Sequence, residues 1–173
     1  PFMEFIGTDD LRRQALILAL ARQESRFVPS AISTSYALGM MQFMPFVAND
    51  IAKKQGLTEF DQDNMFKPEV AYKFANIHLD YLENYLISPV FIAYAYNGGI
   101  GFTNRMLKNG LFDKKGKYEP YLAMELVPYA ESRDYAKKVL ANFVIYAQIL
   151  GLKVSAEDEI LKLSSSEKSD KVR

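Results

Sequence analysis

The amino-acid sequence predicts an all-α protein in which one domain takes up nearly the whole chain. Apolar residues recur at helical spacing through most of the 173 residues, and no segment shows a convincing strand pattern. Hydrophobic residues make up 49% of the chain, which is enough to fill the core of a domain of this length. We therefore expect a compact helical domain without internal repeats.

The first half of the chain contains four expected helices. The first runs from a capping residue among Thr8–Asp10 to about Arg26, because these side chains accept the unpaired N–H groups of a helix start. Proline is favoured in the first turn of a helix and glycine just after its end, and these rules place three more helices. Their expected ranges, separated by loops around 29–35 and 57–68, are 44–54, 68–86 and 88–96.

The second half continues the helical pattern. A helix over 103–109 closes at the glycine that follows it, and a charged connection occupies 112–121. A long helix over 132–150 also stops at a glycine, and Ser155 with Asp158 forms a candidate cap for a last short helix.

We expect the domain to cover residues 1–160 and a disordered tail to cover 161–173, because the tail has too little apolar content to pack. The chain begins at Pro1, with neither an initiating methionine nor a signal segment. We therefore expect it to come from a longer protein with further domains on its N-terminal side, and the segment 1–7 has the character of a junction.

Composition argues against several classes of site. Lys and Arg number 21, as do Asp and Glu, so no net positive field favours a nucleic-acid partner. The chain has no Cys and a single His, which excludes thiolate metal sites, His–His metal pairs and most Ser–His nucleophiles. The single histidine, His78, lies within a helical apolar pattern and is expected to be packed or half-exposed. No apolar run is long enough for a transmembrane segment, and we expect no metal or cofactor.

The first helix ends in the segment "ALARQESRF", which places the carboxyl group of Glu24 on a helix with little polar surface. Glu24 shares a helical face with Ile17 and Leu20, where desolvation would raise its pKa. A carboxylic acid that keeps its proton near neutral pH can serve as a general acid. The helix alone leaves an alternative open, in which Glu24 is solvated and paired with Arg22 or Arg26.

Two further segments carry polar groups suited to a ligand. "STSYALGMMQFMP" combines methionines, which adapt to irregular surfaces, with Gln42, whose amide offers a donor and an acceptor. Such a pair suits the sugar faces and acetamido groups of an amino sugar, although a plain core segment has the same composition. In "AYNGGIG", Tyr96 and Asn97 stand at the edge of a glycine loop, where they could touch a ligand. Without a preceding strand, this loop is weak evidence for a phosphate site.

Four segments, in order, resemble those of one family: "ARQESRFVPSAIS", "ALGMMQFMP", "AYNGG" and "ELVPYAESRDYAKKVL". The chain is similar over about Phe5–Leu150 to the catalytic domain of the soluble lytic transglycosylases, bacterial enzymes that cleave peptidoglycan. The resemblance implies an all-α, goose-type lysozyme-like fold, peptidoglycan glycan strands as substrate, and a location in the periplasm or cell envelope.

The resemblance also implies roles for individual residues. Glu24 matches the sole catalytic acid and base, and Ser33 and Tyr96 match residues that support it. The positions that match substrate-binding residues are Ser25, Gln42, Met44, Asn97 and Glu131. Tyr36 departs from the family pattern, which has glycine there, so the loop beside the acid is expected to be bulkier.

In the implied reaction, Glu24 protonates the glycosidic oxygen between N-acetylmuramic acid (MurNAc) and N-acetylglucosamine (GlcNAc), and the MurNAc acetamido group stabilises the anomeric carbon. Glu24 then removes the proton of the MurNAc C6 hydroxyl, which closes a 1,6-anhydro ring without water. Three alternatives stay open: a silent glycan- or protein-binding module of the same fold, an unrelated helical interaction domain, and a hydrolytic muramidase. The muramidase would need a second carboxylate, for which the candidates are Asp50, Glu59, Asp61 and Asp63.

Overall fold

The structure, a computed structural model, describes residues 1–164, and in this range its regular elements are all helical. The α-helices are α1 (Leu11–Ser25), α2 (Pro45–Lys54), α3 (Pro68–Glu83), α4 (Pro89–Gly98), α5 (Ile100–Lys108), α6 (Tyr121–Glu125), α7 (Ala130–Ile149) and α8 (Ala156–Leu161). Three 3-10 helices accompany them: η1 (Met3–Phe5), η2 (Gln62–Phe66) and η3 (Lys162–Ser164). Within these residues, strand-like pairing is limited to isolated bridges in the loop after α1. The all-α prediction is confirmed.

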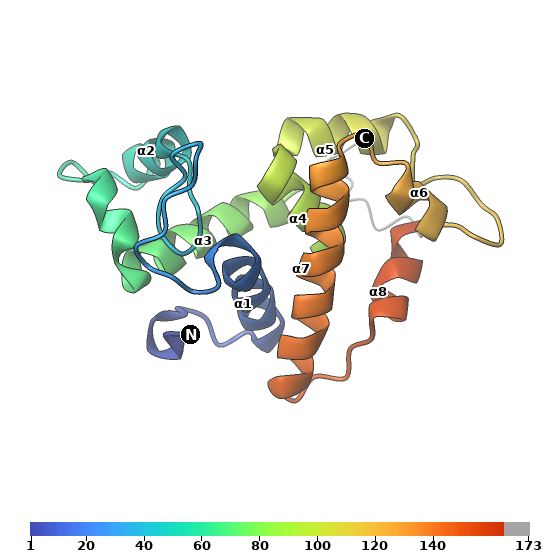
Figure 1. Ribbon diagram of the computed structural model, residues 1–173, viewed down its shortest axis with the longest axis horizontal. Coiled ribbons are helices and arrows are strands. Elements are labelled where there is room, and N and C mark those ends of the chain that lie inside the picture. The colour runs from blue at the N-terminus through green and yellow to red at the C-terminus, as the bar shows by residue number, and fades with distance from the viewer. Residues whose placement is uncertain (165–173) are drawn as a thin grey trace.

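The helices form two halves on either side of α1 (Figure 1). One half, at the left of the view, contains α2 and the loop that joins it to α1, and α3 extends from this half toward the centre. The other half contains α5, α6 and α8, and α7 stands beside α1. The most extensive helix pairing joins α1 to α7, followed by α4 to α7. In Figure 1, the last turn of α1 lies where the two halves meet.

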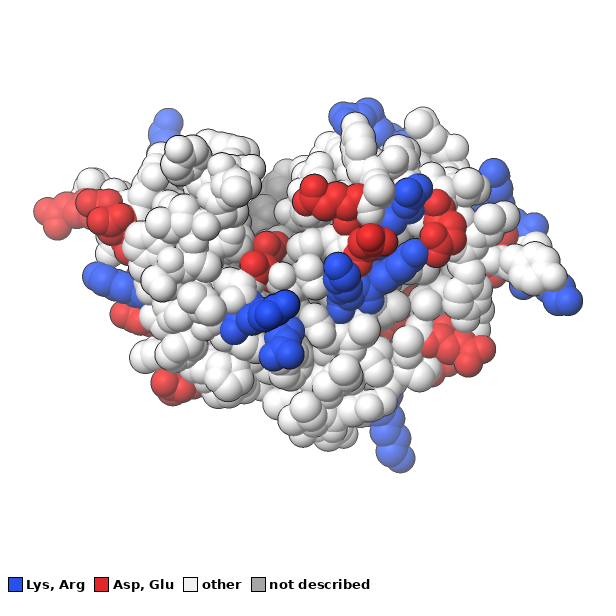
Figure 2. All heavy atoms as spheres, viewed as in Figure 1, with Lys and Arg blue, Asp and Glu red and all other residues white. Residues whose placement is uncertain are grey.

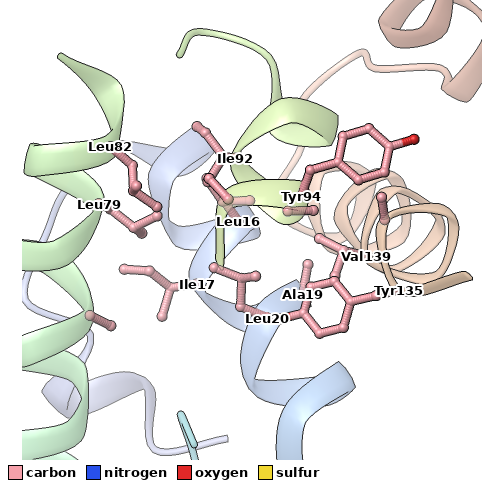
Figure 3. Packing of buried hydrophobic residues seen from close by; sticks show 14 of the residues in the cluster. Leu16, Ile17, Ala19, Leu20, Leu79, Leu82, Ile92, Tyr94, Tyr135 and Val139 are labelled. Atoms are coloured by element: carbon pink, nitrogen blue, oxygen red, sulfur yellow. The ribbon is translucent and has the colours of Figure 1, made fainter. Parts of the chain in front are cut away.

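Helix α1 is the centre of the hydrophobic core. Every residue from Ala15 to Ala21 is buried, so α1 is enclosed by apolar side chains on all faces. Figure 3 shows Leu16, Ile17 and Leu20 of this helix facing side chains from three other helices. These partners are Leu79 and Leu82 of α3, Ile92 of α4, and Tyr135 and Val139 of α7. The expectation that the first helix is central is confirmed.

The predicted caps and stops are largely in place. The Asp10 carboxylate accepts the N–H groups of Arg12 and Arg13 at 2.9 and 3.3 Å, and Ser155 Oγ accepts that of Asp158 at 3.1 Å. The prolines expected at helix starts are the first residues of α2, α3 and α4: Pro45, Pro68 and Pro89.

Two short elements and one loop differ from the expectation. Helix α4 runs on to Gly98 and α5 begins at Ile100, so the glycine loop expected after Tyr96 is reduced to Gly99. The segment 57–68 contains η2, which is held because the Asp61 carboxylate accepts the N–H of Asp63 and the side chain of Met65 is fully buried. The expected charged connection, 112–121, is followed directly by α6, which forms because Ala123 and Met124 are buried there. In both cases tertiary burial supplies the stability that a single turn lacks by itself.

The C-terminal boundary of the folded region lies later than residue 160. Glu159 is 3% exposed and its carboxylate pairs with Arg12 at 2.6 Å and Lys162 at 3.2 Å, which ties α8 to α1. Leu163 in η3 is buried in the core, so the first residues of the expected tail belong to the fold. The rest of that tail, 165–173, lies outside the described residues. Within 1–164, no helix is both long and apolar enough to cross a membrane.

Candidate active site

The candidate site lies at the C-terminal end of α1, where the surface is hollowed between the two halves (Figures 1 and 2). Glu24 belongs to the last turn of α1, and the chain then turns sharply through Arg26 and Phe27, whose φ angles are 56° and 66°. After this left-handed turn the chain enters the 28–44 loop. This loop belongs to the half that contains α2 and forms the wall of the hollow on that side.

The carboxyl group of Glu24 is half-buried and receives a hydrogen bond from the Tyr135 hydroxyl, with 2.5 Å between the two oxygens. Burial raises the pKa of Glu24 to about 7, the hydrogen bond from Tyr135 opposes this rise, and the negative charge of Glu131 adds to it. In the described part of the chain, Glu24 forms no ion pair with Arg22 or Arg26. The desolvation expected from the helical face is therefore present, and the solvated, paired alternative is absent.

Two buried tyrosine hydroxyls lie close to Glu24. That of Tyr135 bonds to the carboxylate directly, whereas that of Tyr96 donates to the carbonyl oxygen of Met41 at 2.9 Å. Burial, together with the charge of Glu24, raises the pKa of both hydroxyls well above the usual value, so both keep their protons. The expected proximity of Tyr96 to the acid agrees with this charge effect, but its hydrogen bond goes to the loop.

Sequence reasoning missed Tyr135 as a site residue. It stands in "ESRDY", one helical turn after Glu131 on α7, and its side chain is 6% exposed. The signal that could have found it is a tyrosine on the apolar face of a helix, because a buried hydroxyl needs a hydrogen-bond partner. The identity of that partner depends on how α7 packs on α1, which the sequence alone did not reveal.

Asn97 and Glu131 lie together at the junction of α4 and α7. The Asn97 side-chain amide donates to Glu131 Oε1 at 3.0 Å, and its Oδ1 accepts from Ser132 Oγ at 2.7 Å. Glu131 is exposed, and its charge reaches Glu24. The structure thus groups Glu24, Asn97 and Glu131, three of the residues expected at the site.

The remaining site candidates mainly hold the loop after α1 in shape. Ser25 Oγ donates to the carbonyl oxygen of Met40 at 2.8 Å. The Gln42 amide N–H groups donate to the carbonyl oxygens of Gly39 and Ala31 at 2.7 and 3.2 Å. Ser33 Oγ accepts N–H groups from within the loop, those of Ser35 and Ala37. Met44 is half-buried at the start of α2.

Glycine is required at one position of this loop. Gly39 has φ +74°, and a Cβ atom added to it would lie 2.0 Å from the carbonyl oxygen of Met65. The backbone of the loop therefore lies directly against η2. Tyr36, at the position where the resemblance implies glycine, also has a positive φ of 63°, and its side chain is 73% exposed.

His78 is packed in an aromatic cluster rather than placed for chemistry. Its ring meets the edges of Phe43 and Tyr96 and stacks on Tyr81, with centroid separations of 5.8, 5.5 and 6.2 Å. Burial lowers the pKa of His78 to about 4, so the ring is neutral at physiological pH. The half-exposed, packed histidine expected from the sequence is confirmed.

Two of the carboxylates considered for a second catalytic role form contacts of their own. Asp50 pairs with Lys54 on α2 at 2.6 Å, and Asp61 caps η2. The carboxylate that acts on Glu24 through its charge is Glu131. Among residues 1–164, no three His, Asp or Glu side chains come together in a group able to hold a metal ion.

Known proteins resemble this chain in sequence and in fold. The sequence pattern described as "Transglycosylase SLT domain" matches residues 8–119. The soluble lytic murein transglycosylase of Salmonella typhimurium is 30% identical over 142 residues, which cover 81% of this chain and 21% of that protein.

Solved structures agree with the sequence matches. The 70 kDa soluble lytic transglycosylase of Escherichia coli superposes with a TM-score of 0.71 and 28% identity, over 84% of this chain and 25% of that one. The Pseudomonas aeruginosa lytic transglycosylase Slt, solved as an inactive glutamate-to-glutamine mutant, gives a TM-score of 0.66 and 28% identity, over 83% of this chain and 23% of that one. The chain thus spans about a quarter or less of the length of these relatives.

Proposed function

The chain belongs to the SLT transglycosylase domain family, and from that premise we propose that it cleaves the MurNAc-β-1,4-GlcNAc bond of peptidoglycan without water. The products would carry 1,6-anhydro-MurNAc ends. Glu24 would act first as acid and then as base. The observation that carries the proposal is the position of Glu24, which burial holds at a pKa of about 7 and Tyr135 holds in place.

A pKa near 7 suits both halves of the reaction. A protonated Glu24 donates its proton to the glycosidic oxygen as the bond to C1 breaks, and GlcNAc leaves with a hydroxyl group. The MurNAc acetamido oxygen stabilises the positive C1. The Glu24 carboxylate then takes the proton of the C6 hydroxyl as that oxygen bonds to C1, which restores the acid and consumes no water.

The surrounding residues would position the acid and the sugar. The Tyr135 hydroxyl donates to Glu24, which favours the carboxylate produced by the first step. The Tyr96 hydroxyl, Ser25 and Ser33 would keep the loop wall in place, while Gln42 and Met44 would contact the glycan from that wall. Asn97 and Glu131 would contact the substrate from the opposite half.

Mass spectrometry of the cleavage products tests the proposal directly. After incubation with purified peptidoglycan, we expect muropeptides that are lighter by one water than those with reducing ends. A hydrolytic muramidase of the same fold is the second candidate, because the charge of a second carboxylate, Glu131, reaches Glu24. Release of reducing-end muropeptides alone would decide for the muramidase, and glycan binding without cleavage would decide for a silent module.

A Tyr135→Phe variant is expected to shift the alkaline limb of the pH–rate profile to higher pH. The wild-type rate should fall as pH rises through about 7, because only protonated Glu24 can act as the acid. The hydrogen bond from Tyr135 lowers the pKa of Glu24, so its removal raises that pKa further. The measurement is kcat/KM for glycan cleavage from pH 5 to about pH 9.

Tyr96→Phe is the matched control for this variant. It removes a buried hydroxyl that bonds to the Met41 carbonyl oxygen instead of to the acid. The alkaline limb of the Tyr96→Phe profile should stay near that of the wild type, whether or not the rate itself changes. A limb that stays in place, or moves to lower pH, in Tyr135→Phe would contradict the assigned role.

A location in the periplasm or cell envelope follows from the proposed substrate, since peptidoglycan is found there. The relatives are several times longer than this chain, which is consistent with an association with further domains.

A further inference from the structure

A positively charged loop and an exposed apolar turn form one surface at the end of the half that contains α6. The connection 112–121 projects outward beside α6 (Figure 1), and positively charged side chains stand at this end of the molecule (Figure 2). We call this surface the 115–122 patch and define it by five exposed residues: Lys115, Lys117, Tyr118, Tyr121 and Leu122. None of these residues belongs to the candidate active site.

The apolar part of the patch is a single turn of chain that faces solvent. Tyr118, Tyr121 and Leu122 are 67%, 42% and 47% exposed. The N–H of Leu122 donates to the carbonyl oxygen of Tyr118 at 2.9 Å, which closes the turn and brings the three side chains to the same part of the surface. Single exposed apolar residues are common, but three within five consecutive residues concentrate apolar surface at one place. Ala123 and Met124 are buried and hold the turn on the core.

The positive charge of the patch is local. The chain as a whole has 21 Lys and Arg residues against 21 Asp and Glu residues. In the part of the chain that the structure describes, neither Lys115 nor Lys117 forms an ion pair with an acidic side chain. The Lys117 ammonium lies 5.4 Å from the centroid of the Tyr118 ring, so this cation stands directly beside the apolar turn.

The acidic side chains nearest in sequence have other contacts. The Glu119 carboxylate accepts the N–H of Ala123 at 3.2 Å, and Glu125 pairs with Lys137 at 2.5 Å. Asp113 lies close to Gly110, at the end of α5. The outer surface of the patch therefore presents cations next to apolar side chains.

We propose that the 115–122 patch binds the surface of a membrane that contains anionic phospholipids. Such a surface offers phosphate groups to the lysines and, just below them, an acyl boundary to the tyrosine and leucine side chains. Tyrosine suits this boundary because its ring is apolar while its hydroxyl can stay hydrated. A projecting loop can enter a lipid surface, which deforms around it, whereas a folded partner would need a matching hollow.

The position of the patch is compatible with activity at the same time. In Figure 1 it lies at the end of the molecule, away from the last turn of α1 and the hollow beside it. A protein attached to a membrane through the patch would keep this hollow free. The proposal concerns attachment alone and does not depend on the reaction assigned to Glu24.

Co-sedimentation with vesicles tests the proposal. The protein is mixed with vesicles of phosphatidylcholine and phosphatidylglycerol and, separately, with vesicles of phosphatidylcholine alone. We expect binding to the anionic vesicles that weakens as salt is added, and much weaker binding to the neutral ones. Lys115→Gln/Lys117→Gln should lower the partition coefficient for anionic vesicles about 30-fold. Tyr118→Ser/Leu122→Ser should lower it about tenfold at every salt concentration, because salt does not screen the apolar contribution.

Two double variants serve as matched controls. Lys53→Gln/Lys73→Gln removes two exposed lysines from α2 and α3, and Ile145→Ser/Ile149→Ser removes two exposed apolar side chains from α7. Both should bind anionic vesicles like the wild type. The patch variants should keep the wild-type melting temperature and the wild-type rate on soluble glycan strands, since their residues are exposed and lie outside the active site.

Three results would overturn the proposal while leaving the proposed function intact. The first is a wild-type protein that does not bind anionic vesicles. The second is an equal loss of binding in Lys53→Gln/Lys73→Gln, because any surface lysine would then contribute alike. The third is binding to polyglutamate or to purified peptidoglycan that the patch variants lose, without binding to vesicles, which would assign the patch to an acidic partner or to the substrate polymer.

Discussion

Replacing Glu24 with glutamine is expected to lower the rate of glycan cleavage about 10³-fold or more while leaving the protein folded. Glutamine has the shape of the protonated acid and its carbonyl oxygen can still accept the hydrogen bond from Tyr135, but it cannot deliver a proton. The measurement is muropeptide release under saturating substrate, together with a thermal unfolding curve.

The matched control is Glu157→Gln, which makes the same chemical change at an exposed position in the first turn of α8. It should keep the wild-type rate. A Glu24→Gln variant that retains more than about a tenth of the rate would remove Glu24 from the catalytic role. A large fall in its melting temperature would instead attribute the loss of activity to unfolding.

Gly39→Ala is expected to destabilise the fold by about 4 kcal/mol, the largest single-residue effect on stability that we predict. The new methyl group would lie 2.0 Å from the Met65 carbonyl oxygen, and the main chain of η2 would have to move to accommodate it. The left-handed φ of +74° adds strain for any residue with a Cβ atom. Urea unfolding at constant pH measures the loss.

Gly56→Ala separates these two causes. Gly56 has φ +67°, and a Cβ atom there would meet nothing within 4 Å. Its substitution should cost only the backbone strain, about 1 kcal/mol. Equal losses of stability in the two variants would show that the contact between Gly39 and η2 is absent.

Most of the fold could be predicted from the sequence because its long helices are marked by local signals. The prolines at the starts of α2, α3 and α4 and the cap at Asp10 act within one helical turn, so they can be recognised without tertiary structure. The short elements η2 and α6 could not be predicted because their stability comes from burial of Met65 and Ala123 by distant parts of the chain.

The candidate site was predictable to a similar degree and for the same reason. The apolar face that desolvates Glu24 is a property of one helix, and it predicted the direction of the pKa change. The partner of that carboxyl group, Tyr135, is 111 residues away along the chain and comes close only through the packing of α7 on α1. The backbone hydrogen bonds of Ser25 and Gln42 are equally invisible to a local pattern. The substrate contacts that the resemblance implies for both residues stay a prediction.

The burial of α1 has a consequence for how the site behaves when the protein fluctuates. A helix enclosed on every side can lose its hydrogen bonds only when most of the core opens with it, whereas short surface helices such as α6 can open locally. Glu24 lies in the last turn of this helix, just beyond the buried run that ends at Ala21, and the hydrogen bond from Tyr135 ties it to α7 as well. The candidate carboxyl group is therefore held by the core through its helix and by α7 through Tyr135, so local opening of α6 should leave its position unchanged.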